Sequence, residues 1–219
     1  MKTAILFDLD GTLLDTLGDL HASTNAVLRQ FGYPERTIEE VRHFVGNGAR
    51  RLIEQAVPAG EQARVDEVLS AFQTYYAAHC DILTRPYPGI LELLASLEGK
   101  YPLAVVSNKP DRAVKELAKI YFPALYARGE SADCPRKPAP DMVYMAMQAL
   151  GAENCVYVGD SEVDVLTAKN ASVPCLSVTW GFRDEEILRQ TGAQFFCHRA
   201  EDVPKCIEEI LKREQENGK

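Results

Sequence analysis

The sequence predicts an α/β protein: a doubly wound, Rossmann-like parallel sheet with a block of helices inserted after its first strand. Three observations support this. Short apolar runs end abruptly in polar residues, helical patterns stand between these runs, and residues 16 to 82 show helical periodicity with no convincing strand. Strands that alternate with helices along a chain are typical of a parallel sheet with helices on both faces.

Four short apolar runs are the expected strands. They do not alternate with polar residues and are rich in branched side chains, as in strands buried on both faces. The runs cover 4–7, 103–106, 155–158 and 175–178. The expected helices cover 88–98, 111–120, 140–150 and 162–171. Ligands of such sheets bind beyond the carboxyl ends of the strands, so the polar residues after the runs should surround one crevice.

The inserted block is expected to form a second domain. Apolar residues at helical spacing indicate three helices, with Leu17, Ile53 and Val65 on their apolar faces. We therefore predict a helical cap over residues 16–83, and a core formed by 1–15 and 84–219. The alternative is one mixed domain without a movable cap. The acidic tail from 208 to 219 is expected to be a terminal helix.

Composition narrows the classes of function. The 219 residues are 46% hydrophobic and 26% charged, a globular balance, and no apolar run approaches the roughly 20 residues that cross a bilayer. The start of the chain lacks the pattern of a secretory signal, so we expect a cytoplasmic protein with its six scattered cysteines reduced. The net charge of −8 argues against non-specific nucleic-acid binding, and no membrane partner is expected.

The first apolar run ends in the segment from Asp8 to Thr12, which carries the strongest local signal for a catalytic site. In an extended strand residues i and i+2 share a face, so Asp8 and Asp10 would repel each other unless a cation lies between them. Gly11 allows a sharp turn, and Thr12 offers a hydroxyl and a backbone donor to a phosphate. A solvated acidic turn is the alternative.

A second acidic group follows the run 155–158. Asp160 could add a carboxylate to the same cation, and oxygen-only ligands favour Mg²⁺ over zinc or copper. Asp164, one helical turn further on, could orient a water or a ligand, or it could simply favour a helix N-terminus.

Polar residues that could hold a phosphate occur at two further places. Ser107 and Asn108 follow the run 103–106, where they could donate to phosphate oxygens, cap a helix, or do both. Lys137 lies next to Pro138 and could pair with both a nucleophile and a phosphate. An ordinary solvated lysine is the alternative.

These motifs, in this order, resemble those of the haloacid dehalogenase superfamily, over essentially the whole chain. The resemblance implies that Asp8 attacks phosphorus and that Asp10 acts as general acid and base. It implies that Mg²⁺ is held by Asp8, Asp160 and the backbone carbonyl of Asp10, the only cofactor expected. The residues implied to hold the phosphoryl oxygens are Thr12, Ser107, Asn108 and Lys137.

Within that superfamily the chain most resembles the bacterial phosphoglycolate phosphatases. The supporting segments are 45–49, 107–110, 137–141 and 179–182. The resemblance implies that the substrate is a small phosphorylated metabolite, above all 2-phosphoglycolate. Asn47 and Arg50 of the cap are candidates to bind its carboxylate.

Several alternatives stay open. A pyrophosphatase or a broad sugar-phosphate phosphatase would use the same residues, as would a β-phosphoglucomutase, although Ala49 stands where such mutases place a cap arginine. A non-catalytic phospho-aspartate receiver would lack the long insert and would have no use for Asp10. The sequence indicates neither an oligomeric state nor the resting position of the cap.

Overall fold

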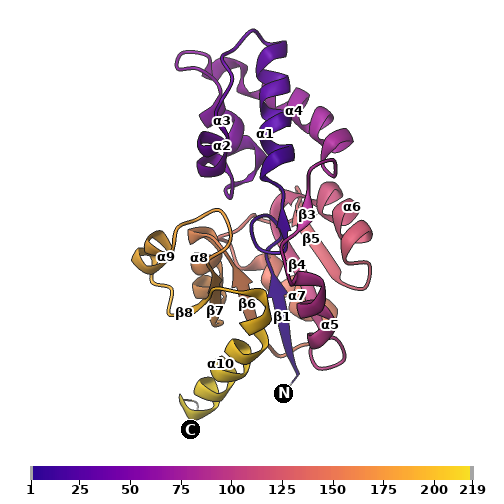
Figure 1. The fold of residues 1–219 in the computed structure, drawn as a ribbon, viewed down its shortest axis with the longest axis vertical. Helices are drawn as coiled ribbons and strands as arrows, with labels where there is room; N and C mark the ends of the chain where they lie inside the picture. Colours follow the sequence, from indigo (N-terminus) through magenta and orange to yellow (C-terminus); the bar gives the residue numbers. More distant parts are fainter. Residues whose placement is uncertain (1, 218–219) are drawn as a thin grey trace.

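The structure is a computed structural model and describes residues 2–217 (Figure 1). The strands are β1 (Thr3–Phe7), β2 (Leu14–Asp15), β3 (Arg85–Pro86), β4 (Leu103–Pro110), β5 (Tyr126–Glu130), β6 (Asn154–Gly159), β7 (Cys175–Val178) and β8 (Phe195–Cys197). The α-helices are α1 (Leu17–Gln30), α2 (Ile38–Phe44), α3 (Gly48–Ala56), α4 (Val65–His79), α5 (Ile90–Leu97), α6 (Asp111–Tyr121), α7 (Asp141–Leu150), α8 (Glu162–Ala171), α9 (Glu185–Thr191) and α10 (Val203–Asn217).

A six-stranded sheet in the order β5-β4-β1-β6-β7-β8 forms the centre, and each neighbouring pair is parallel. β1 lies between β4 and β6, with Ile5 paired to Leu103 on one side and to Val156 on the other. The α/β prediction is therefore confirmed. Because β4, β1 and β6 are neighbours, the residues that follow them meet at one edge of the sheet.

Both faces of the sheet are buried, which explains the unalternated apolar runs. Along β1, Ile5 and Phe7 contribute to a core shared with α5, α6 and α10, whereas Ala4 and Leu6 contribute to a core shared with α7 and α8. Successive side chains of a strand point to opposite faces. A strand covered by helices on both sides therefore needs apolar residues at every position.

Helices α1 to α4 form a group of their own at the top of Figure 1, beyond the carboxyl ends of the strands. Two short antiparallel strands, β2 and β3, connect this group to the sheet. Asp19, buried in α1, ties the connections together: its carboxylate accepts hydrogen bonds from Leu83 N, Thr84 N and Thr84 Oγ1, at 2.8 to 3.0 Å. The division into a core and a cap at residues 16 and 83 stays a prediction.

The structure differs from the expected elements at several places. β4 continues beyond Val106 to Pro110, with a register shift against β5. β5 itself was not predicted, because an edge strand with charged and half-exposed residues lacks an apolar run. The short β8 and helices α2 and α9 were also missed. Helix α10 includes most of the predicted terminal helix, whose residues 218–219 lie outside the described part.

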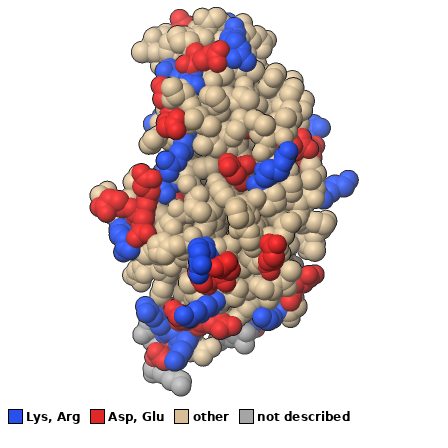
Figure 2. All heavy atoms as spheres, in the orientation of Figure 1, with Lys and Arg blue, Asp and Glu red and all other residues tan. Residues whose placement is uncertain are grey.

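Charges of both signs are mixed on the surface. On the face drawn in Figure 2, lysine and arginine side chains lie beside acidic ones over both the helical group and the sheet. Among residues 2–217 no helix combines the length and the apolar character that a membrane crossing requires.

Candidate active site

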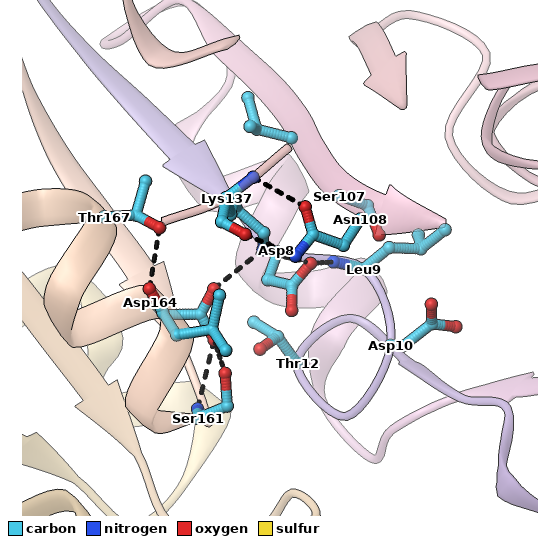
Figure 3. Close-up of polar contacts among 12 residues, drawn as sticks. Asp8, Leu9, Asp10, Thr12, Ser107, Asn108, Lys137, Ser161, Asp164 and Thr167 are labelled. Atoms are coloured by element: carbon cyan, nitrogen blue, oxygen red, sulfur yellow. Dashed lines mark hydrogen bonds and ion pairs between the residues drawn. The ribbon is translucent and has the colours of Figure 1, made fainter. Parts of the chain in front are cut away.

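Three neighbouring strands bring the predicted residues together (Figure 3). Asp8 follows β1, and its backbone N–H donates to Val158 O of β6 at 2.9 Å. Ser107 lies in β4 and Asp160 directly follows β6. All three side chains are buried, as is Lys137 from the loop before α7. The structure thus brings Asp8, Ser107 and Asp160 to neighbouring strand ends, and their shared role in one site stays a prediction.

Lys137 holds Asp8 in a fixed orientation. The Nζ of Lys137 lies 2.9 Å from Asp8 Oδ1 and 2.8 Å from Asp164 Oδ1, and it donates to the Tyr157 hydroxyl at 3.0 Å. An ammonium group has three N–H donors, so these partners occupy all of them. Asp8 Oδ1 also accepts from Leu9 N at 2.7 Å. Lys137 is thus no surface charge, and Asp8 is locked through one oxygen.

Tyr157 is a site residue that sequence reasoning missed. It lies in the apolar run of β6, where a tyrosine resembles an ordinary core residue. Its hydroxyl accepts from Lys137 and donates to Val106 O at 3.1 Å. No local pattern distinguishes such a tyrosine, because both partners come from distant parts of the chain.

Asn108 positions the lysine loop. Its Oδ1 accepts from Lys137 N at 2.7 Å, and its Nδ2 donates to Lys137 O at 2.9 Å and to Gly46 O at 3.1 Å. Both amide hydrogens are therefore engaged by backbone carbonyls, one from the lysine loop and one from the helical group. Neither Ser107 nor Asn108 caps a helix, since α6 begins after Pro110.

Three carboxylates form a compact acidic group. One oxygen each from Asp8, Asp160 and Asp164 lies within 4.8 Å of the others. Asp160 accepts from Thr12 Oγ1 at 2.9 Å and from Phe182 N at 2.7 Å, so Thr12 donates to a carboxylate in this structure. Asp164 accepts from Ser161 N and Oγ, because Ser161 is the N-cap of α8 and Asp164 completes its capping box, and it also contacts Lys137. Asp164 thus contributes to the N-terminus of α8 and contacts Lys137, and its expected role in orienting a water or a metal ligand stays a prediction.

The electrostatics of this group favour a bound cation. Burial, and then the carboxylate of Asp164, raise the pKa of Asp8 and raise the pKa of Asp160 to about 7. Gly11 and Gly181 pack so closely on Asp160 that a Cβ at either position would collide with its carboxylate. A divalent cation would offset the mutual repulsion, and an all-oxygen set of donors fits Mg²⁺.

Asp10 faces away from this group (Figure 3). Its Oδ1 accepts from Thr16 Oγ1 at 2.6 Å and from Lys109 Nζ at 2.7 Å. Lys109 is buried, and its ammonium group also lies 4.6 Å from the ring centroid of Tyr76 in α4. Sequence reasoning gave Lys109 no role, because nothing local indicates that a lysine in this position is buried.

A small cavity of about 50 Å³ lies between the site and the helical group. Asp8, Asp10, Ser107, Asn108 and Lys109 form its floor, and residues from the helical group, among them Leu20, Val45, Ala49, Leu52, Phe72 and Tyr76, form its roof. The two predicted cap residues do not line it. Arg50 is exposed and pairs with Asp66 and Glu54, and Asn47 precedes α3 without a side-chain cap bond. Helix α3 turns Gly48, Ala49 and Leu52 to the cavity, which leaves Arg50 on another face.

Arg183 connects the helical group to the acidic group. Its side chain is 7% exposed, and its guanidinium donates to Arg42 O at 2.9 Å and to Val45 O at 2.6 Å. Its Nε donates to Glu162 Oε2 at 2.8 Å. Arg183 follows Phe182, whose N–H binds Asp160. The end of α2 is therefore fastened beside a carboxylate of the site.

Fold and site together define the class: an α/β phosphatase built around buried carboxylates and a buried lysine. A family model described as haloacid dehalogenase-like hydrolase matches residues 5–178. The chain belongs to the haloacid dehalogenase-like hydrolases, and the predicted family and class of enzyme are confirmed.

Several relatives cover nearly the whole chain. Phosphoglycolate phosphatase 1 of Pseudomonas aeruginosa is 32% identical over 95% of this chain and 80% of its own length. Phosphoglycolate phosphatase of Agrobacterium fabrum is 37% identical, with 82% and 81% covered. Among solved structures, a provisionally named phosphoglycolate phosphatase from Lactobacillus delbrueckii subsp. bulgaricus is 38% identical with a TM-score of 0.89, covering 94% of this chain and 99% of its own. These proteins are similar in sequence and fold to the chain described here.

Proposed function

We propose that this protein is a Mg²⁺-dependent phosphatase that hydrolyses small phosphate monoesters through an aspartyl-phosphate on Asp8, with 2-phosphoglycolate as its preferred substrate. The observation that carries the proposal is the hydrogen bonding of the Asp8 carboxylate, which in the described part of the chain engages only one of its two oxygens. One carboxylate oxygen is held by Lys137 and Leu9 N, and within residues 2–217 the other has no hydrogen-bond partner. A buried, oriented carboxylate with one free oxygen is suited to attack phosphorus.

The first half of the reaction transfers the phosphoryl group to Asp8. The free carboxylate oxygen forms a bond to phosphorus while the bond from phosphorus to the ester oxygen breaks. Asp10, protonated, gives its proton to the departing alkoxide. Asp10 must leave Thr16 and Lys109 to do so, and apo structures often hold catalytic groups away from their working positions. Lys137 compensates the charge on Asp8 throughout.

The second half releases phosphate. Asp10 takes a proton from a water, the water oxygen bonds to phosphorus, and the bond to Asp8 breaks. Ser107, at the floor of the cavity, is placed to donate to phosphoryl oxygens, as are Thr12 and Asn108 once their present contacts yield. Asp8, Asp160 and the Asp10 carbonyl would hold Mg²⁺, with Asp164 orienting this set. When bound, Mg²⁺ supplies charge neutralisation to the transferring phosphoryl group.

The helical segment 16–83 is proposed as a cap that excludes water from this reaction. The names of the relatives support phosphoglycolate as substrate, and the small cavity supports a compact ester. The same proposal places the enzyme in the cytoplasm, acting on a small phosphorylated metabolite without nucleic-acid or membrane partners.

Phosphate release from a substrate panel tests the proposal. The panel contains 2-phosphoglycolate, sugar phosphates, nucleotides and pyrophosphate, each with Mg²⁺ and with EDTA. We expect a preference for 2-phosphoglycolate that is lost without metal and in Asp8→Asn. Asp81→Asn, on the exposed surface, is the matched control and should behave as wild type.

The outcomes separate the parts of the proposal. Metal-dependent release from other esters, with none preferred, would retain the mechanism and remove the substrate. Full activity in Asp8→Asn would refute the nucleophile. Phosphate returned to a sugar phosphate rather than to water would identify a mutase.

A further inference from the structure

The cavity between the site and the helical group contains two hydrogen-bond donors that the reaction above does not use. Lys109 Nζ makes one hydrogen bond in the described residues, to Asp10 Oδ1, although an ammonium group can donate three. The Tyr76 hydroxyl is buried and has no hydrogen-bond partner within residues 2–217. Both residues line the cavity that Asp8 and Asp10 also line.

An unpartnered buried hydroxyl is costly, and most such groups in folded proteins have a partner. Tyr76 is 3% exposed and packs on Phe72, with 5.5 Å between the ring centroids. Its position beside the Lys109 ammonium, on the wall of a cavity next to the reacting aspartate, indicates that the missing partner is a ligand.

The chemistry of the walls restricts that ligand. Lys109 contributes a positive charge and Tyr76 a neutral donor, while the rest of the roof is apolar. The surroundings therefore suit a small anion with two acceptor oxygens rather than a polyhydroxylated sugar. A volume of about 50 Å³ has room for only a few water-sized groups. Because Asp8 lines the same space, the anion must be close to the phosphoryl group.

We propose that Lys109 and Tyr76 bind the carboxylate of a phosphate monoester whose alcohol carries that carboxylate on a short chain. The inference rests on the proposed phosphatase function and deepens it, because it assigns the residues that select the substrate. They replace Asn47 and Arg50, which the structure leaves outside the cavity. Lys109 contacts Asp10 in this structure and is released when Asp10 moves to the leaving group, so the anion binds beside the proposed acid.

The experiment compares 2-phosphoglycolate with its primary amide, 2-phosphoglycolamide, in which a neutral group of the same shape replaces the carboxylate. The value of kcat/KM for each substrate is measured with Mg²⁺ for wild type, Tyr76→Phe and Lys109→Met. Tyr75→Phe makes the same chemical change on the same helix at a side chain that is 37% exposed, and it serves as the matched control.

We expect wild type and Tyr75→Phe to prefer the carboxylate. In Tyr76→Phe the preference should fall about tenfold to a hundredfold, as for one hydrogen bond to a charged group, with the loss confined to the carboxylate substrate. Lys109→Met should lower the preference further. If the role of Tyr76 were purely structural, Tyr76→Phe would lower kcat/KM equally for both substrates. That outcome would overturn the inference, as would an unchanged ratio of the two kcat/KM values.

Binding measurements guard against a variant that folds poorly. In an Asp8→Asn background, calorimetry should find 2-phosphoglycolate bound more tightly than the amide, and Tyr76→Phe should abolish the difference. Hydrolysis of p-nitrophenyl phosphate separates the two proposals. If Asp8 and Mg²⁺ support that hydrolysis but the carboxylate gives no advantage, only the carboxylate site is refuted. If neither substrate nor p-nitrophenyl phosphate is hydrolysed, both proposals fail.

Discussion

Replacing Lys137 with methionine tests the central ion group. The substitution keeps the length and apolar stem of the side chain and removes the charge. It leaves Asp8 and Asp164 unpaired at sites where their side chains are 10% and 0% exposed. Removing one partner of a buried ion pair costs about 3–5 kcal/mol, because an uncompensated charge stays buried. At about 2–4 °C per kcal/mol for a chain of this size, Tm should fall by roughly 6–20 °C.

Urea denaturation and calorimetry, both in EDTA, would measure this loss. Lys212→Met, on the exposed side of α10, is the control and should stay within about 0.5 kcal/mol of wild type. The deficit should shrink as pH falls toward 4, because Asp8, whose pKa is raised by burial and no longer lowered by Lys137, becomes neutral by binding a proton. A loss below about 1 kcal/mol, as for a surface pair, would refute the reasoning.

Three further predictions concern the metal, the pH and the connection to the helical group. Mg²⁺ at a hundred times its Kd should stabilise wild type by about 2.7 kcal/mol in a thermal melt, and Asp160→Asn should lose most of this gain. Without metal, the pKa of Asp160 is raised to about 7, so the native state retains a proton that the unfolded state releases near pH 4. As pH rises from 4 to 7, the free energy of unfolding of wild type should therefore fall relative to that of Asp160→Asn, as measured by urea midpoints. Arg183→Met should cost about 1–3 kcal/mol and speed amide hydrogen exchange over residues 42–48, because the carbonyls of Arg42 and Val45 lose their donor.

Each of these predictions has a specific contrary result. Equal stabilisation of Asp160→Asn by Mg²⁺ would remove Asp160 from the metal site. Parallel pH profiles for wild type and Asp160→Asn would mean that Asp160 ionises normally. Arg189→Met, on neighbouring α9, is the control for Arg183, and equal exchange in the two variants would refute the role of Arg183.

The sheet and the reacting groups could be predicted because their signals are local. A strand buried on both faces must be apolar throughout, so polar residues at its end, such as Asp8 and Asp160, stand out. The strand β5 gave no such signal, since it lies at the edge of the sheet.

The residues that were missed depend on contacts between distant segments. Tyr157, Lys109 and Arg183 each bind partners far away in the sequence, and each belongs to a type that is more often core or surface. Arg50 was assigned to the substrate from its position in the chain. Which face of α3 meets the cavity is decided by packing, because the apolar side of this helix marks a buried face without showing what that face contacts.

The buried carboxylate of Asp19 has a consequence for protein engineering. It fastens the outgoing and returning connections of the helical segment to each other through the backbone of Leu83 and the backbone and hydroxyl of Thr84. A chimera that exchanges this segment with that of another enzyme would separate Asp19 from the Thr84 backbone and hydroxyl donors if the splice points fell at residues 16 and 83. Grafts that carry both Asp19 and Thr84 should keep the two connections in their native arrangement, because the hydrogen bonds from Thr84 to Asp19 are then retained.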